Sequence, residues 1–253
     1  MYAEERRAEI AERASRNGRV EVARLADDFA VTPETVRRDL TDLERRGVLR
    51  RVHGGAIPVG RLRSEPAVAE KAALMAAEKR RIAEAALDHL PRTGTILLDA
   101  GTTTGALADL LPTDRDLTVV TNGLPIAMTL STRSNLTLLL VGGRVRGRTL
   151  AQVDDWAVRT LDELSVDVAF LATNGVSVAR GLTTPDPAEA AAKRAMVRTG
   201  RQVVLLADRT KIGEEHFVRF ADLADVDVLI TDAGAAETDV TAIAAAGVEV
   251  VRA

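Results

Sequence analysis

Apolar residues in the first 45 positions recur at the three- and four-residue spacing of amphipathic helices. A first helix is predicted between residues 2 and 17, where the apolar positions are Ala3, Ile10, Ala11 and Ala14 and Asn17-Gly18 ends the pattern. A second, short helix is predicted from Val20, Val22, Leu25, Ala26 and Phe29. Both precede a third helix that has clearer signals at its ends.

The third predicted helix begins after Thr32. The Thr32 hydroxyl can accept a hydrogen bond from a free backbone N–H group, and Pro33 suits the first helical position. Gly47 is the predicted stop. The apolar face consists of Val36, Leu40 and Leu43, and the other faces carry Thr35, Arg37, Arg38 and Thr41. Taken alone, this pattern also fits a surface helix with solvated charges.

A short alternating segment follows the third helix. Val48, Arg50 and Val52 alternate with Leu49, Arg51 and His53, and the pair Gly54-Gly55 permits a tight turn. A two-stranded hairpin is therefore predicted. Three helices followed by a basic hairpin are typical of a winged helix-turn-helix, in which the last helix lies in the DNA major groove and the hairpin reaches phosphates. The alternative is a hairpin whose arginines form only a solvated edge.

The pattern changes again beyond residue 58. A polar link covers residues 58–66, and a long helical pattern then runs from Val68 to Leu90. From Thr95 the chain consists of short apolar runs separated by helix-length segments, and these runs cover residues 96–98, 117–120, 136–141, 166–171, 203–206, 228–230 and 248–251. Because the runs are continuous rather than alternating, they predict strands that are covered on both faces, as in a Rossmann-like, mostly parallel α/β domain.

The predicted organisation is accordingly an N-terminal winged helix-turn-helix followed by an α/β domain. We expect a DNA-binding domain at 1–57, a linker and connecting helix at 58–94, and a ligand-sensing domain at 95–253. A chain of 253 residues is long enough for two domains.

The segment after the first apolar run has the composition of a phosphate-binding loop. Asp99-Ala100-Gly101-Thr102-Thr103-Thr104-Gly105 combines small residues with three hydroxyl groups, and a helix is predicted to follow at residues 106–111. The segment lacks the lysine of a Walker loop and the GxGxxG of dinucleotide sites. A capping turn is the alternative interpretation.

Small polar residues also follow the other runs. They are Thr121-Asn122-Gly123, Gly142-Gly143-Arg144, Thr173-Asn174-Gly175 and Asp208-Arg209-Thr210-Lys211. Ligands bind beyond the carboxyl ends of parallel strands, so Arg144 and Lys211 are the candidate cations for an anion. Glu189 and Lys193 lie four residues apart on one predicted helix and could equally form a surface ion pair.

Composition limits the possible chemistry. The net charge is −3, so DNA binding requires a local patch, and residues 32–63 provide one with eight arginines against four acids. There is no cysteine, and His53, His89 and His216 are far apart, so neither a metal site nor a cofactor is expected. The first residues lack an apolar signal core and no apolar run could span a bilayer, which predicts a cytoplasmic protein without membrane contact.

Both halves resemble the DeoR family of bacterial transcriptional regulators. Residues 6–57 resemble its winged helix-turn-helix through the segments 32–40 and 43–56, which end in His53-Gly54-Gly55-Ala56. The segments at 98–103, 121–123, 142–144, 174–175, 181–193 and 206–211 resemble its sensor domain, which shares a fold group with ribose-5-phosphate isomerase and glucosamine-6-phosphate deaminase.

The resemblance implies a regulator, most simply a repressor of a sugar-catabolic operon, whose operator binding changes with a phosphorylated sugar. The sensor resembles members associated with fructose and other phosphotransferase-system sugars, which makes fructose 1-phosphate the first effector to test. The expected DNA-binding residues are Thr32, Thr35, Arg37, Arg38, Arg50, Arg51 and His53. The expected effector-binding residues are Asp99, Gly101, Thr102, Thr103, Thr104, Thr121, Asn122, Gly143, Arg144, Asn174, Asp186, Glu189, Lys193, Asp208 and Lys211. A homodimer or homotetramer is expected, since operators usually consist of repeated half-sites.

Two other functions fit parts of the sequence. A sugar-phosphate isomerase or deaminase with an added DNA-binding domain would need positioned acids and bases, and residues 171–177, where the isomerases are rich in carboxylates, contain none. An architectural DNA-binding protein would leave the polar strand ends without a purpose. A regulator that is not an enzyme is therefore predicted.

Overall fold

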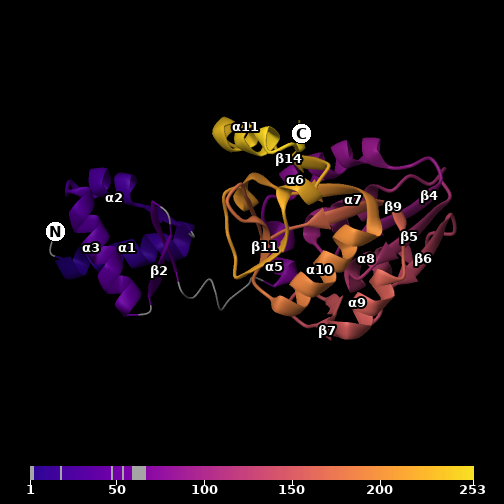
Figure 1. Ribbon diagram of the computed structural model, residues 1–253, viewed down its shortest axis with the longest axis horizontal. Helices are drawn as coiled ribbons and strands as arrows, with labels where there is room; N and C mark the ends of the chain where they lie inside the picture. Colours follow the sequence, from indigo (N-terminus) through magenta and orange to yellow (C-terminus); the bar gives the residue numbers. More distant parts are fainter. Residues whose placement is uncertain (1–2, 18, 47, 53, 59–66) are drawn as a thin grey trace. The chain divides into compact units, whose positions relative to one another are not determined.

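The computed structural model describes residues 3–17, 19–46, 48–52, 54–58 and 67–253 (Figure 1). The chain divides into two compact units, residues 1–65 and 66–253. Among the residues described, no helix is both long enough and apolar enough to cross a membrane.

The first unit contains three helices and a small antiparallel sheet. The helices are α1 (Ala3–Asn17), α2 (Val22–Phe29) and α3 (Pro33–Arg45). The sheet has the order β1-β3-β2, with β1 (Val20–Glu21), β2 (Leu49–Val52) and β3 (Gly55–Pro58). Its core is formed by residues from all three helices and the sheet, among them Ile10, Leu25, Val36, Leu40 and Leu49.

The small sheet of the first unit contains a third strand, β1, that the sequence pattern did not predict. Val20 was assigned to the second helix, but it pairs with Ala56 as part of β1. Gly55 permits this close approach, because a Cβ atom at that position would lie 1.9 Å from the carbonyl oxygen of Val20. Two residues are too few to show a strand periodicity, and their strand conformation depends on the pairing partner.

A seven-stranded parallel sheet forms the centre of the second unit, in the order β15-β14-β12-β9-β4-β5-β6. The strands are β4 (Gly94–Leu98), β5 (Leu117–Thr121), β6 (Leu136–Leu140), β9 (Val166–Ala172), β12 (Gly200–Leu206), β14 (Val228–Thr231) and β15 (Glu249–Arg252). Each corresponds to one of the seven predicted apolar runs. The predicted fold class is confirmed.

Helices cover both faces of this sheet, so successive strand residues enter different cores. Leu97 belongs to the core under α9 (Asp154–Asp162), α10 (Pro187–Thr199) and α11 (Glu237–Ala245). Its neighbours Ile96 and Leu98 belong to the core under α6 (Ala76–Ala86), α7 (Thr102–Leu110) and α8 (Leu124–Leu130). This two-sided burial is why the strand sequences are continuously apolar.

Residues 68–90 do not form the single long helix that the pattern predicts. The segment consists of α5 (Val68–Ala73), α6 and the 3₁₀ turn η1 (Leu87–His89). The break falls at Leu74-Met75, where Met75 has a left-handed φ of +57°. Ile82, Ala83 and Ala86 pack in the core of the second unit. The sequence pattern gives no sign of this break, because the break depends on tertiary contacts and not on a local helix-stop residue.

Short antiparallel elements were not predicted at all. β7 (Arg144–Arg146) pairs with β8 (Ala151–Val153). β10 (Gly175–Ser177), β11 (Gly181–Thr184) and β13 (Val218–Ala221) form a separate three-stranded sheet. The 3₁₀ turns η2 (Arg209–Lys211) and η3 (Leu223–Asp225) complete the unit. These strands, of three or four residues each, join segments that follow the main sheet and so surround its carboxyl edge.

Candidate functional site

The N-terminus of α3, the helix with the exposed arginines, is capped by a side chain. The hydroxyl of Thr32 accepts a hydrogen bond from the backbone N–H of Thr35 at 3.2 Å, and Pro33 occupies the first helical turn. Val36, Leu40 and Leu43 are buried, whereas Arg37 and Arg38 are exposed and Thr35 is half-buried. The predicted division of this helix into a core face and a polar face is therefore present in the structure.

A shallow hollow of about 420 Å³ lies beside this polar face. Its arginines come from α1, α3 and β2 and are Arg7, Arg37, Arg38, Arg45 and Arg51. The guanidinium of Arg51 in β2 donates to the hydroxyl of Thr41 at 3.2 Å, and its backbone N–H donates to Glu44. These contacts connect the hairpin to α3, so that both present positive charge on one side.

The arginines of this hollow differ in how they are paired. Arg37 lies 3.4 Å from Glu34, and Arg7 lies 3.1 Å from Asp42. Within the described residues, Arg38 forms no ion pair closer than 4 Å. Its guanidinium therefore has no ion pair to break before it can meet a phosphate or a base edge.

Two predicted DNA-binding positions are not placed by the structure. His53 lies outside the described residues, as does Gly47, the predicted helix stop. The backbone of Arg50 belongs to β2, and its side chain is outside the description.

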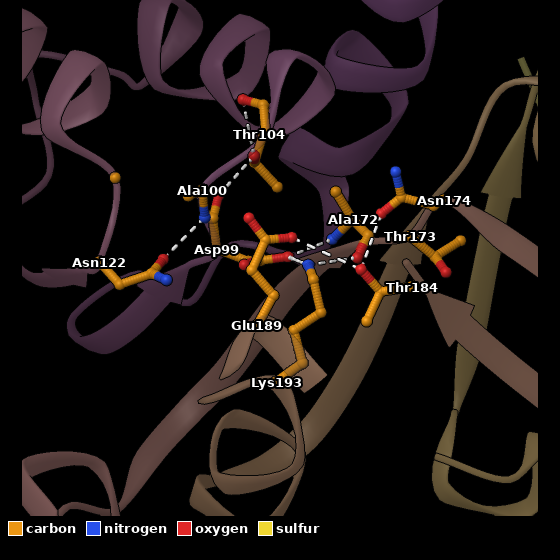
Figure 2. A network of polar contacts seen from close by, with 12 residues as sticks. Asp99, Ala100, Thr104, Asn122, Ala172, Thr173, Asn174, Thr184, Glu189 and Lys193 are labelled. Carbon is orange, nitrogen blue, oxygen red and sulfur yellow. Dashed lines mark hydrogen bonds and ion pairs between the residues drawn. The ribbon is translucent and has the colours of Figure 1, made fainter. Parts of the chain in front are cut away.

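A buried ion pair forms the centre of the polar network at the carboxyl edge of the main sheet (Figure 2). The Lys193 ammonium of α10 donates to the carboxylate of Asp99, which follows β4, and to the carbonyl oxygen of Ala172 at 2.9 Å. The same carboxylate accepts the backbone N–H of Ala172 at 3.0 Å. Both residues are at least 95% buried. The alternative that Glu189 and Lys193 form a surface pair is wrong, because α10 turns both inward.

Asn122 and Thr104 connect the ends of β4 and β5 to the network. The Asn122 side-chain oxygen accepts the N–H of Ala100 at 2.8 Å, and its amide donates to the carbonyl of Gln152. The Thr104 hydroxyl donates to the carbonyl of Asp99 at 2.6 Å. Thr121 is also buried and donates to the carbonyl of Leu98. The hydroxyls of Thr104 and Thr121 thus donate to backbone carbonyl groups. For Thr104, this differs from the expectation that all three hydroxyls of residues 102–104 can donate to a ligand.

Glu189 connects α10 to the β7–β8 hairpin. Its carboxylate accepts hydrogen bonds from the hydroxyl of Thr149 and from the guanidinium of Arg146, the latter at 3.0 Å. Arg146 also lies 3.1 Å from Asp186, the side chain that caps α10. On β11, the Thr184 hydroxyl lies 3.1 Å from the side-chain oxygen of Asn174.

A cavity of about 340 Å³ is lined by the segments that follow β4 and β5. Ala100, Gly101 and Thr102 form one wall, at the start of α7, and Gly123 and Thr149 form another. Residues from α5 and α6, including Val68, Ala72 and Lys79, line the remaining side. Gly101 caps α7 without a side-chain hydrogen bond, so its first backbone N–H groups are not capped by a side chain. The helix predicted at 106–111 corresponds to α7, which begins earlier, at Thr102.

Lys79 is a site residue that sequence reasoning missed. Its side chain projects from the first turn of α6, is 5% exposed and lines the cavity. Burial lowers the pKa of Lys79, and the nearby positive charge of Lys211 lowers it further against the attraction of Asp208. The only available signal was a lysine on the apolar side of a predicted helix, which is unusual for an unpaired charge.

Asp208 and Lys211 lie together after β12. Asp208 is buried and its carboxylate accepts the backbone N–H of Thr210, which caps η2. The adjoining Arg209 donates to Asp232 at the end of β14. Burial by itself raises the pKa of Asp232, but hydrogen bonds from the Arg209 backbone and guanidinium and from Gly234 outweigh it, so the pKa is lowered.

Arg144 does not join the cavity. Its side chain is exposed and forms a 2.5 Å ion pair with Asp154, which raises the pKa of the guanidinium. It lines a separate hollow with Gly143, Asp155 and Trp156. Gly143 itself is structurally required, because its φ is +109° and a Cβ atom would lie 2.6 Å from the carbonyl oxygen of Val153. Arg146, two residues further along β7, is the arginine that the structure joins to the network.

The two units match two known protein families. The DeoR-like helix-turn-helix domain matches residues 6–60, and the DeoR C terminal sensor domain matches residues 74–233. The chain belongs to the DeoR family. The family resemblance of the sequence is thereby confirmed.

Relatives within the DeoR family align over nearly the whole chain. The HTH-type transcriptional regulator GlpR of Haloferax volcanii is 38% identical over 99% of this chain and 98% of its own length. The uncharacterized regulator FruR of Bacillus subtilis is 37% identical over 92% of each chain. The glycerol-3-phosphate regulon repressor of Escherichia coli K12 is 31% identical over 88% of each.

These DeoR-family relatives are named as a transcriptional regulator and a regulon repressor, which agrees with the prediction of a regulator. Among solved structures, ribose 5-phosphate isomerase A from Methanocaldococcus jannaschii covers 54% of each chain, with 16% identity and a TM-score of 0.40.

Proposed function

We propose that this DeoR-family regulator is a repressor of a sugar-catabolic operon and that a phosphorylated sugar bound in the cavity above β4 and β5 changes its affinity for operator DNA. The observation that carries the proposal is the composition of this cavity. It brings the start of α7 and the ammonium of Lys79 to one space. A phosphate group is the ligand that an uncapped helix N-terminus and a buried cation both favour.

Size and lining support a small, partly apolar ligand. A volume of about 340 Å³ is at the lower end for small-molecule sites. Alanines from α5, α6 and α7 line it beside the polar groups. A sugar phosphate offers both an anionic end and a compact body with hydroxyl groups. The name of one relative, the glycerol-3-phosphate regulon repressor of Escherichia coli K12, also refers to a phosphate ester.

The predicted effector residues fall into two groups in this proposal. Gly101 and Thr102 line the cavity and would contact the ligand. The other predicted residues near the sheet edge would hold the cavity walls, and these are Asp99, Thr103, Thr104, Thr121, Asn122, Asn174, Asp186, Glu189, Lys193 and Asp208. Lys211 adds positive charge near Lys79. We assign no ligand contact to Gly143 and Arg144.

For the DNA-binding unit, we propose that Thr35, Arg37 and Arg38 of α3 face the major groove and that Arg51 steadies the hairpin beside it, with Thr32 capping the helix. We further propose a homodimer or homotetramer, which would place recognition helices on repeated half-sites, and a cytoplasmic location, where operator DNA lies. The effector would act by favouring one arrangement of these helices over another, as inducer or as corepressor.

A combined stability and operator-binding assay tests the proposal. The full chain is heated with fructose 1-phosphate, fructose 6-phosphate, glycerol 3-phosphate or unphosphorylated fructose. A specific effector at 100 times its dissociation constant adds about 2.7 kcal/mol to the free energy of unfolding. The same compound should change the affinity of the chain for its operator DNA. If a broad panel of pentose and hexose phosphates produces no thermal shift, the effector class is wrong.

A further inference from the structure

Helix α5 lies over the effector cavity but is held there by few interactions. Val68, Ala69 and Ala72 line the cavity, yet no residue of α5 is buried. Its N-cap, Ala67, offers no side-chain hydrogen bond, and the backbone N–H of Val68 donates to the carbonyl of Arg148 at 3.0 Å. A six-residue helix has little stability of its own. Besides its packing against α7, its position therefore depends on the contacts at its two ends.

At the C-terminal end of α5, the main contact is made by Lys79. The ammonium donates to the carbonyl oxygens of Lys71 and Leu74, the latter at 2.7 Å. These are carbonyls of the last turn, where a helix lacks backbone partners, and a cation there also complements the helix dipole. The Leu74 side chain is 59% exposed and contributes little packing. Lys79 thus holds the C-terminal end of α5 through two hydrogen bonds, and this contact is called the latch below.

The charge of Lys79 is also available to a ligand in the cavity. Lys79 lines the cavity and is almost fully buried from solvent. Among the described residues, no carboxylate forms an ion pair with it within 4 Å; Asp208 attracts it from further away, whereas Lys211 and Lys71 repel it. A buried ammonium that is bonded only to carbonyls has a strong demand for a counter-charge. An anion in the cavity would supply one.

We propose that Lys79 couples the cavity to α5: its ammonium binds the anionic group of the effector and, in doing so, gives up the carbonyls of Lys71 and Leu74, which releases α5. The junction favours such a release, because Met75 has a left-handed backbone at φ +57° that the surrounding contacts must maintain. The chain continues from α5 through residues 59–66 to the hairpin of the DNA-binding unit. The released segment is therefore the part of the sensor unit that directly follows the link to the DNA-binding unit in the sequence.

This inference rests on the proposed function for the identity of the effector but not for its test. Inorganic phosphate serves as the probe, and amide hydrogen exchange of residues 67–75 is followed in the full chain. In Lys79→Met, exchange in this segment should rise by about tenfold without any ligand, as expected for the loss of a hydrogen bond to a charged donor. In the wild type, phosphate should produce the same rise, and in Lys79→Met it should have no further effect.

Two further variants make the test specific. Arg80→Met removes a neighbouring positive charge on α6 that is exposed and pairs with Glu84, and it should behave as the wild type. Lys79→Gln keeps a neutral donor for the carbonyls, so it should retain part of the protection while losing the phosphate response. Unchanged exchange of β4 amides shows that each variant is folded.

The outcomes separate the two proposals. Unaltered exchange of 67–75 in Lys79→Met overturns the latch, and a phosphate response that persists in this variant overturns the role of Lys79 as anion ligand. If sugar phosphates stabilise the wild type and Lys79→Met equally, the proposed function stands while this inference fails. If phosphate releases α5 through Lys79 but no sugar phosphate binds, the inference stands and the effector class is wrong.

Discussion

The ammonium of Lys193 and the carboxylate of Asp99, 94 positions apart in the chain, form a buried ion pair at the carboxyl edge of the sheet. Lys193 also donates to the carbonyl of Ala172, and Asp99 also accepts the N–H of the same residue. One residue of β9 is therefore held from both sides. The pair joins α10 to the ends of β4 and β9, and the segment after β4 lines the proposed site.

Breaking this ion pair should strongly destabilise the sensor unit. Lys193→Met leaves the Asp99 charge buried and unpaired, which typically costs about 3–5 kcal/mol in the free energy of unfolding. The double variant Asp99→Leu/Lys193→Met should lose less than the sum of its two single variants, because it leaves no unpaired charge. Urea unfolding measures all three. Arg198→Met, which removes an exposed pair with Asp162, is the control and should cost less than about 1 kcal/mol. Additive losses would show that the two charges do not act as a pair.

Replacing Arg38 should weaken operator binding without affecting the sensor. If its guanidinium meets a base edge, Arg38→Ala should cost about 1–3 kcal/mol and relax specificity at one position. If it meets a phosphate, the slope of log affinity against log salt should fall by about 1. Fluorescence anisotropy with labelled operator at several salt concentrations distinguishes the two. Arg201→Ala on β12, an exposed arginine of the sensor unit, should bind operator like the wild type. Unchanged affinity in Arg38→Ala would mean that the recognition face is assigned wrongly.

Gly105 offers a way to fill the cavity without disturbing the fold. It lies on α7, lines the cavity, and a Cβ atom at this position would meet nothing within 4 Å. Gly105→Ala should stabilise the helix by about 0.5–1 kcal/mol and retain the effector response. Gly105→Leu should remain folded and bind operator, but the thermal shift with the effector should be lost because the side chain occupies the ligand volume. Thermal shift and operator binding check both variants, and a full effector response in Gly105→Leu would place the ligand elsewhere.

Asp232 should make stability depend on acid pH. Its lowered pKa means that the ionised form is favoured in the folded chain. The contribution is therefore fully present above the ordinary pKa of an aspartate and is lost as pH falls through the lowered value. Urea unfolding of the wild type and Asp232→Asn between about pH 7 and about pH 3 should show a stability difference that shrinks on acidification. A difference that stays constant with pH would show that the Asp232 carboxylate is not stabilised by Arg209 and Gly234.

The sequence by itself determined the architecture. The three helices with their apolar stripes in residues 3–45 and the seven continuous apolar runs correspond to observed elements, although Val20 belongs to β1 and not to the second helix. Such features are local, because a capping hydroxyl, a proline or a doubly buried strand leaves its mark within a few residues. The family also followed from motifs spread over both units.

Tertiary structure alone decided which polar groups meet. Lys193 pairs with Asp99 rather than with Glu189, Arg146 replaces Arg144 at the network, and Lys79 reaches the cavity from a helix that appeared continuous. The reason is physical. The direction of a side chain depends on how its helix packs against the sheet, and an ion pair between residues far apart leaves no spacing along the chain to detect.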